Sequence, residues 1–429
     1  MRFIERNIIL KIKDIASKFP VVFLTGPRQS GKSTLLKTMY PDYTYINLEE
    51  KDIRDFAHSD PRSFLASYGD RVIIDEAQRA PDLFSYLQTR VDEKDRPGMY
   101  ILSGSQNFLM LRNISQSLAG RVGILSLLPF SLNELAKARR LPKTVNEWMF
   151  NGAYPRLVCA EIDAPDFYSG YIATYVERDI RQEVKVHDLD KFRRFLGICA
   201  ASVGSPINLS KTGAQVSADA RTINSWLSIL EESYIIFRLA PYHRSMGTRF
   251  IKTQKLYFYD TGLLCALLGF SSADELALHP MRGHIFESAV ISEIVKNRCN
   301  TGKTPRLYYW RDSDNREKEI DLIEENLQEL VLSEIKSSQT ANRDYIKNLL
   351  KFDIEGKKCT KQVIYDGNDG PVLSGVRFIN WKSFADEAIF PPSNQRGPKK
   401  LKKRKTPREK EVRKPGGLPD VTSAEKQDD

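Results

Sequence analysis

Short apolar runs alternate with longer amphipathic segments over the first 130 residues of the chain. The runs Val21–Leu24 and Arg71–Ile74 and the segment MYILSGSQ (99–106) predict three strands, and a fourth apolar run follows Arg121. Strand-length apolar runs that are separated by helical segments are typical of α/β domains. The N-terminal part of the chain is therefore predicted to be an α/β domain.

The pattern changes between residues 188 and 260, where helices precede a hairpin. LSKTGAQ (209–215) predicts a short helix, and Ser217 is predicted to cap the helix after it. The β-prone runs 234–242 and 255–260 then resemble the wing of a winged helix-turn-helix. In that fold the second helix enters a DNA major groove, whereas the alternative is a winged helix that only packs between its neighbours. Both interpretations stay open, because the positive charges at Lys211, Arg221, Arg244 and Arg249 are too few to decide between them.

The last folded region has a third pattern. It predicts, in order, a helix, three strands, a helix and a strand: His284–Arg298, Arg306–Arg311, Lys318–Ile323, Glu329–Ser337, Asn342–Phe352 and Gln362–Tyr365. This order resembles that of restriction-endonuclease-like folds, so a nuclease-like C-terminal domain is expected.

Candidate chemistry begins directly after the first predicted strand, with the sequence GPRQSGKST. The spacing GxxxxGK[ST] between a strand and a helix is that of a phosphate-binding loop (P-loop), in which backbone N–H groups surround a phosphate. Lys32 would contact the β- and γ-phosphates of ATP, and Ser33 would bind Mg²⁺. The predicted loop residues are Gly26, Pro27, Arg28, Gln29, Ser30, Gly31, Lys32, Ser33 and Thr34.

Acidic and polar residues follow the next two strands. Asp75 and Glu76 lie 43 and 44 residues beyond Lys32, where Asp75 would hold Mg²⁺ and Glu76 would activate the attacking water. Ser105 and Gln106, after the third strand, are expected to contact the γ-phosphate. Arg121 is the candidate for stabilising charge on the transferring phosphate, in cis or from a neighbouring subunit. The alternative for Arg121 is an ordinary surface arginine.

These motifs, together with NGAYPRL (151–157) and YIATYVERDIRQ (171–182), resemble the prokaryotic ATPases of the AAA superfamily that carry a C-terminal domain of unknown function. The resemblance covers roughly residues 1–385. It implies ATP binding and supplies little about biological role.

The C-terminal region also carries a candidate metal site. Asp321, followed thirteen residues later by Glu334 and Lys336, resembles the PD-(D/E)XK signature, although Ile320 stands where that signature has proline. Alternation along a strand puts Glu334 and Lys336 on one face. Two carboxylates would then bind Mg²⁺ or Mn²⁺, and Lys336 would orient water, with Glu287 as an additional acid. The alternative is a charged hairpin with a solvated face, but the residues around these charges are apolar, which favours the metal site.

Composition and charge restrict the expected order of the C-terminal tail and the expected location of the protein. The net charge is +10, and residues 391–429 hold +6 of it in a segment with few apolar residues, which predicts a disordered tail. Such a tail binds nucleic-acid phosphates or simply keeps the protein in solution. The five cysteines are scattered, no apolar run is long enough for a membrane helix, and the charged start does not resemble a secretory signal. A cytoplasmic protein without membrane contact is expected.

The sequence thus predicts four regions: an AAA-type P-loop domain (1–145), a helical and winged-helix region (146–275), a nuclease-like domain (276–388) and a basic tail (389–429). The expected function is Mg²⁺-dependent ATP binding and hydrolysis, coupled to a nucleic-acid-binding, nuclease-like half for which DNA is the favoured partner. The alternative is an ATP-driven switch whose C-terminal half only binds DNA or a protein. Both a monomer and a homo-oligomer are compatible with the sequence.

Overall fold

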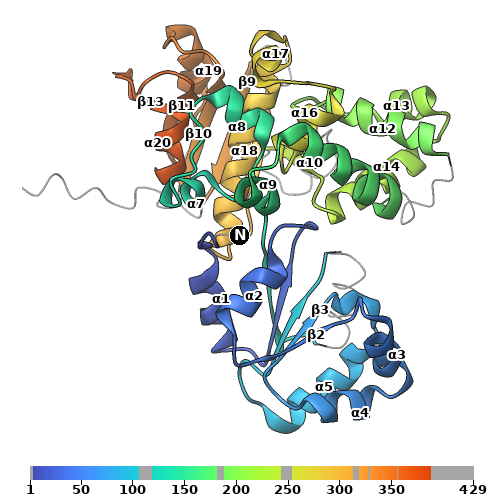
Figure 1. Cartoon of the computed structure of the whole chain (residues 1–429). Helices are drawn as coiled ribbons and strands as arrows, with labels where there is room; N and C mark the ends of the chain where they lie inside the picture. The colour runs from blue at the N-terminus through green and yellow to red at the C-terminus, as the bar shows by residue number, and fades with distance from the viewer. Residues whose placement is uncertain are drawn as a thin grey trace, which may run out of the picture. The chain divides into compact units, whose positions relative to one another are not determined.

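The computed structural model describes residues 3–105, 118–180, 188–242, 254–312, 318–326, 329–354 and 356–387, without the side chains of 178–179 and 385–387. Gln106, Arg244, Arg249 and the basic tail therefore lie outside the described residues. Figure 1 shows the arrangement of the helices and strands.

The N-terminal part contains a five-stranded sheet in the order β2-β3-β4-β1-β5, with all neighbouring strands parallel. The strands are β1 (Val21–Thr25), β2 (Thr44–Asn47), β3 (Val72–Asp75), β4 (Tyr100–Ser103) and β5 (Val122–Ser126). The helices are α1 (Ile9–Ala16), α2 (Lys32–Met39), α3 (Lys51–Ser59), α4 (Pro61–Tyr68) and α5 (Leu83–Lys94), with the short 3₁₀ turn η1 (Ala77–Arg79). The predicted α/β domain is confirmed.

Helices cover both faces of this sheet. Successive residues of a strand point to opposite sides, so β1 contributes side chains to the core on each face. Val21 and Phe23 of β1 pack into one hydrophobic cluster with residues of α4 and α5. Val22 and Leu24 pack into the other cluster with residues of α1 and α2. Strands buried on both faces read as continuous apolar runs, which is why the sequence pattern identified them.

A helical region follows, and Figure 1 shows its helices in green. It comprises α7 (Leu132–Lys137), α8 (Val145–Asn151), α9 (Pro155–Ala160), α10 (Ala164–Tyr171), the π-helical η2 (Ile172–Ile180), α12 (Leu189–Ala201), α13 (Leu209–Val216) and α14 (Ala220–Glu232). The predicted pair of helices corresponds to α13 and α14. The predicted buried face of α14 is confirmed for Ile223, Trp226, Leu227 and Leu230.

The predicted cap of α14 is wrong by two residues. Ser217 has a left-handed φ of 54° and ends α13. Asp219 caps α14 instead, and its side chain accepts a hydrogen bond of 2.7 Å from the backbone N–H of Thr222. Serine and aspartate are both good N-caps, so residue type did not decide between them. The backbone did, because Ser217 is left-handed whereas Asp219 is extended and directly precedes α14.

The second sheet has eight strands in the order β12-β13-β11-β10-β9-β8-β6-β7. The strands are β6 (Ile236–Pro241), β7 (Lys255–Phe258), β8 (Leu307–Arg311), β9 (Glu319–Glu325), β10 (Glu329–Lys336), β11 (Lys358–Tyr365), β12 (Val372–Leu373) and β13 (Val376–Asn380). The helices are α16 (Thr261–Leu267), α17 (Ala273–Leu278), α18 (Arg282–Asn300), η3 (Arg343–Ile346), α19 (Lys347–Lys351) and α20 (Trp381–Glu387). The predicted order of helix, three strands, helix and strand is present from α18 to β11.

The predicted wing is part of this sheet. β6 and β7 pair antiparallel as expected, but β6 also pairs with β8 in parallel orientation. One hydrophobic cluster spans both regions and contains Phe195, Leu227, Phe286 and Ile364. The helical region and the C-terminal strands are therefore packed on a shared core. In the part of the chain that is described, no helix is both long and apolar enough to cross a membrane.

Candidate functional site

The phosphate-binding loop follows the carboxyl end of β1. Gly26 has a φ of 144°, and a Cβ atom there would lie 2.1 Å from the carbonyl oxygen of Leu127. Only glycine fits this position, because a side chain would collide with rigid backbone. Gly31 has a φ of 91° and directly precedes α2, so the helix N-terminus points at the loop. This geometry is suited to binding an anion.

Lys32 is folded back onto the loop. Its ammonium group donates hydrogen bonds to the carbonyl oxygens of Gly26 (2.9 Å) and Pro27 (2.8 Å). Burial lowers the pKa of Lys32 to about 8, although Glu76 and Asp75 act in the opposite direction. The lysine is held in the loop by backbone oxygens that a phosphate group would replace as its partners.

Asp75 lies at the carboxyl end of β3, and both of its oxygens are hydrogen-bonded. The Ser103 hydroxyl donates to Oδ1, and the Tyr45 hydroxyl donates to Oδ2 at 2.5 Å. Burial alone would raise the pKa of Asp75, but hydrogen bonds from Ser103, Ser33 and Tyr45 outweigh it and lower this pKa. Asp75 is thus a carboxylate next to Ser33, as the predicted Mg²⁺ site requires.

Glu76 follows with a left-handed φ of 52°. Its Oε2 accepts hydrogen bonds from Gln78 and, at 3.4 Å, from the Ser105 hydroxyl. The structure therefore brings Ser105 to the predicted catalytic acid. Tyr45 and Gln78 were missed by the sequence reasoning, since a tyrosine on a strand and a glutamine in a turn carry no motif of their own.

The structure does not bring Arg121 to the P-loop of its own chain. β1 and β5 are parallel in the register Val21↔Val122, so Arg121 precedes β5 at the edge of the sheet opposite the loop. Its guanidinium forms a bidentate ion pair with Asp92 of α5, in which Nε contacts Oδ1 and Nη2 lies 2.9 Å from Oδ2. The hydrogen bonds that Arg121 donates to Asp92 raise the pKa of Arg121. This position does not favour action in cis.

The P-loop also contacts residues from distant parts of the sequence. Arg6 is 4% exposed and donates to the carbonyl oxygens of Ser30 (2.9 Å) and Leu128 (2.6 Å) and to Glu134 (3.1 Å). In addition, the Arg28 guanidinium lies 5.4 Å from the ring centre of Tyr175. Tyr175 belongs to the motif YIATYVERDIRQ, and a Cβ atom at Gly31 would lie 3.6 Å from the Pro155 side chain of NGAYPRL, so both motifs include residues beside the P-loop.

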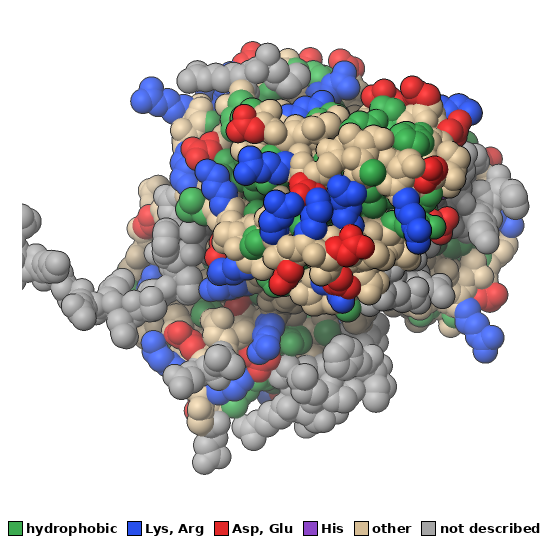
Figure 2. Space-filling view, turned by 90° about the horizontal axis from the view of Figure 1, so that it is seen from below, with side chains coloured by type: hydrophobic (Ala, Val, Ile, Leu, Met, Phe, Trp, Pro, Cys, Tyr) green, Lys and Arg blue, Asp and Glu red, His purple; other side chains and the backbone are tan. Residues whose placement is uncertain are grey.

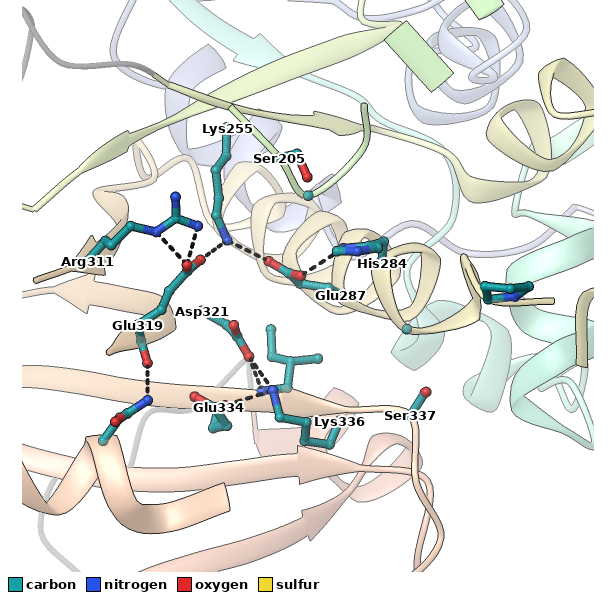
Figure 3. A pocket seen from close by; sticks show the side chains of 15 residues that line it. Ser205, Lys255, His284, Glu287, Arg311, Glu319, Asp321, Glu334, Lys336 and Ser337 are labelled. Atoms are coloured by element: carbon teal, nitrogen blue, oxygen red, sulfur yellow. Dashed lines mark hydrogen bonds and ion pairs between the residues drawn. The ribbon is translucent and has the colours of Figure 1, made fainter. Parts of the chain in front are cut away.

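A second candidate site lies between α18, β7, β9 and β10. It is a cavity of about 440 Å³ that Figure 3 shows from close by. Its charged lining residues are Lys255, His284, Glu287, Arg311, Glu319, Asp321, Glu334 and Lys336. All four predicted residues of the nuclease-like site thus line one cavity. Lys255, Glu319 and Arg311 were not predicted, although Glu319 lies only two residues before Asp321 on the same strand.

Lys336 lies between two of the acids. Its ammonium group is 2.7 Å from Glu334 Oε1 and 3.5 Å from Asp321 Oδ2, and the backbone N–H of Ile335 also donates to Asp321 Oδ2 at 2.8 Å. The other oxygen of Glu334 is buried and has no hydrogen-bond partner among the residues that the structure describes. Burial and the nearby Asp321 raise the pKa of Glu334. Burial acts to lower the pKa of Lys336, but Asp321 and Glu334 outweigh it and raise this pKa.

The other acids of the cavity are paired with Lys255. This lysine is 3% exposed; it pairs with Glu319 and lies 3.4 Å from Glu287 Oε1. Tyr257 donates to the same Glu287 oxygen at 2.6 Å, and Arg311 pairs with Glu319. Burial raises the pKa of Glu287, against the effect of Lys255. The cavity therefore contains two clusters, each with two carboxylates and a lysine.

These residues fit a divalent cation in one of the two clusters. Carboxylate oxygens are the ligands that Mg²⁺ and Mn²⁺ prefer, and Glu334, which lines the cavity, has one buried oxygen without a hydrogen-bond partner among the described residues. Within the described residues, no three acids, histidines or cysteines come together as a ready metal site. A cation here would be held by Asp321 and Glu334, with Lys336 moved aside.

Comparison with known families divides the chain into three parts. A family described as an AAA domain matches residues 18–136, and two domains of unknown function, DUF8612 and DUF4143, match residues 142–274 and 282–384. The first match supports an AAA-type P-loop ATPase domain at the N-terminal end.

Full-length relatives and solved structures are similar to this chain at low identity. An uncharacterised protein of Mycobacterium tuberculosis is 29% identical over 74% of this chain and 70% of its own length. An uncharacterised protein of Haemophilus influenzae is 24% identical over 78% of this chain and 87% of its own length. Among solved structures, a Walker-type ATPase of Pyrococcus abyssi is 16% identical, with a TM-score of 0.39, and covers 62% of this chain and 96% of that one. The RuvB Holliday junction branch migration motor of Thermotoga maritima is 16% identical, with a TM-score of 0.26, and covers 54% and 87%.

Proposed function

We propose that the protein binds and hydrolyses ATP with Mg²⁺ and that nucleotide binding is coupled to a nucleic-acid-binding, nuclease-like C-terminal half. The observation that carries the ATPase is the convergence of Lys32, Asp75 and Glu76 at one edge of the sheet, beside a loop whose Gly26 tolerates no side chain. The match of an AAA-domain family to residues 18–136 supports it independently.

Each residue has a distinct task in this proposal. The loop N–H groups and the N-terminus of α2 bind the phosphates, and Lys32 exchanges its two carbonyl partners for phosphate oxygens. Mg²⁺, where bound, supplies positive charge to the phosphate oxygens, with Ser33 and Asp75 as its protein partners. Glu76 orients the attacking water and accepts its proton, while Ser105 and Gln78 hold the Glu76 carboxylate in place.

The test is turnover of ATP by the full chain. The wild type is expected to release phosphate in a Mg²⁺-dependent reaction, and Lys32→Ala is expected to lose ATP binding. Lys51→Ala is the matched control, because Lys51 is exposed on α3 and pairs only with Asp55 among the contacts of the described chain. Equal turnover by the wild type and Lys32→Ala would refute the proposed site.

The cavity at α18 favours a second activity, metal-dependent cleavage of a nucleic-acid backbone. The specific observation is the buried, unpaired oxygen of Glu334 beside Asp321 and Lys336. Asp321 and Glu334 would hold Mg²⁺ or Mn²⁺, which polarises a phosphate and lowers the pKa of bound water. Lys336 would then orient that water, and Glu287 would stay on the opposite wall of the cavity.

Incubation with single- and double-stranded DNA and RNA tests this activity, with and without ATP, in Mg²⁺ or Mn²⁺. Cleavage that is lost in Glu334→Gln and Lys336→Ala but kept in Lys358→Ala, an exposed residue of β11, supports a nuclease. A protein that binds DNA without cutting it supports the alternative, an ATP-driven switch.

The charges on the described surface do not by themselves identify a nucleic-acid partner, so binding has to be measured. On the face in Figure 2, Lys and Arg side chains lie close together with Asp and Glu side chains beside them. Most of the excess positive charge belongs to residues 391–429. Deletion of 391–429 is expected to weaken DNA binding and to reduce the slope of log affinity against log salt, because fewer counterions are released. An unchanged slope would show that this segment does not contact DNA.

A further inference from the structure

The two acid–lysine clusters of the cavity differ in how completely they are paired. In the first cluster, Glu334 uses one oxygen for Lys336, and its other oxygen is buried without a partner in the described part of the chain. In the second cluster, one Glu319 oxygen pairs with Lys255 and the other with Arg311. The first cluster therefore has an acceptor left for a ligand, whereas Glu319 in the second does not.

Glu287 is also held by several groups. Its Oε1 accepts from Tyr257 at 2.6 Å and lies 3.4 Å from the Lys255 ammonium. Its Oε2 lies 3.9 Å from Nδ1 of His284. In Figure 3, Lys255 extends from its strand to a position between Glu287 and Glu319. Lys255 therefore pairs with both acids of the second cluster.

The two lysines differ in mobility as well. The side chain of Lys336 is 35% exposed, so it has a path to water when a cation takes its place beside Asp321 and Glu334. The side chain of Lys255 is 3% exposed and has no such path. Withdrawing it would leave the buried carboxylate of Glu287 without its lysine partner, which is strongly unfavourable, and would leave Glu319 with Arg311 alone.

We propose that Lys255 takes the place of a second divalent cation, so that this cavity binds one metal ion, at Asp321 and Glu334, and uses an ammonium group where Glu287 and Glu319 would otherwise hold another. This inference rests on the metal site of the proposed function. Lys255 is supplied by β7, a strand that the sequence pattern assigned to a wing, so a residue outside the predicted nuclease-like domain (276–388) lines the site.

The number of bound Mn²⁺ ions tests the proposal. The titration uses Mn²⁺ alone, without nucleotide, in the full chain carrying Lys32→Ala and Asp75→Ala so that the P-loop contributes no ion. Free Mn²⁺ is measured by electron paramagnetic resonance. The parent is expected to bind one Mn²⁺ per chain, and Lys255→Met two, because the ammonium group between Glu287 and Glu319 is then gone. Lys255→Arg is expected to bind one.

Two further variants make the count decisive. Lys255→Met combined with Glu319→Gln removes a carboxylate of the second cluster and is expected to return the count to one. Lys358→Met is the matched control on an exposed strand residue and is expected to bind one. Should Lys255→Met fold poorly without metal, its melting temperature is expected to rise more with Mn²⁺ than that of the parent, through binding to the folded state.

The outcomes separate this proposal from the function on which it rests. A parent that binds no Mn²⁺ overturns the metal site itself. A parent that binds one ion and a Lys255→Met variant that also binds one, with the same rise in melting temperature, overturn only the role of Lys255. A parent that already binds two ions overturns it as well.

Discussion

The hydroxyl of Tyr45 lies 2.5 Å from Oδ2 of Asp75, and Ser103 donates to the other oxygen of the same carboxylate. Tyr45 belongs to β2 and Ser103 to β4, the two strands on either side of β3. The position of the predicted Mg²⁺-binding acid is thus set from both neighbouring strands. Lys37 also lies over the Tyr45 ring, 3.6 Å from its centre.

Tyr45→Phe is expected to raise the Mg²⁺ concentration that gives half-maximal ATP hydrolysis. A hydrogen bond to a charged group contributes about 1.5–3 kcal/mol, so a shift of about tenfold is expected if the bond orients Asp75 for the ion. Turnover is measured against Mg²⁺ at saturating ATP. Tyr43→Phe is the control, because the Tyr43 hydroxyl bonds to the Gly98 carbonyl instead. An unchanged Mg²⁺ requirement would assign Tyr45 a packing role only.

Glu76→Gln is expected to keep ATP binding and to lower turnover by about 100-fold or more, since proton transfer by a positioned base contributes at least that much. The substitution removes the base and leaves Asp75 and Ser33 in place. Binding is measured by calorimetry and turnover by phosphate release. Glu49→Gln, on an exposed residue paired with Arg79, should leave both unchanged. Loss of binding in Glu76→Gln would contradict the assignment.

Substitutions of Arg121 and of Asp92 are expected to change the rate of ATP hydrolysis differently if Arg121 acts on a neighbouring subunit. Arg121→Ala is then expected to slow hydrolysis at least tenfold, while Asp92→Ala, which frees the arginine, keeps or raises activity. Turnover per chain should also rise with protein concentration. A surface ion pair contributes at most about 1 kcal/mol, so equal small effects of the two substitutions would identify an ordinary surface pair.

Glu293 of α18 is expected to make stability depend on pH. Burial raises its pKa to about 7, and one of its oxygens has no partner, while the other accepts from the Leu132 N–H at 2.8 Å. The folded state therefore binds the proton more tightly than the unfolded state, whose glutamate has a pKa of about 4.3. The free energy of unfolding should fall as pH rises from about 5 to about 7 and stay lower above that, because folding then buries a charge.

Glu293→Gln is expected to remove this decline, which amounts to at most about 4 kcal/mol, because each unit of pKa difference between the folded and unfolded states is worth about 1.36 kcal/mol. Urea unfolding of the full chain at several pH values measures it. Glu93→Gln is the control, because Glu93 is exposed on α5. Parallel pH profiles for the wild type and Glu293→Gln would show that Glu293 stays charged in the folded protein.

Local sequence was sufficient for the P-loop and for the strands that carry Asp75 and Ser103. The loop requires small residues and a lysine at fixed spacing, and strands buried on both faces are apolar throughout, so both features are written in neighbouring residues. The order from α18 to β11 was predicted for the same reason. Asp321, Glu334 and Lys336 were found because alternation along a strand determines which side chains share a face.

Only the tertiary structure decided which residues from distant segments meet. Tyr45 reaches Asp75, and Lys255 reaches Glu287 and Glu319, through the lateral order of strands, which no local pattern encodes. The same order places Arg121 at the edge opposite its own P-loop and makes β6 and β7 part of the second sheet rather than a separate wing. Strand pairing depends on long-range burial and backbone hydrogen bonding. The sequence therefore predicted residues of each candidate site separately, and the pairing of strands in the two sheets brings them together.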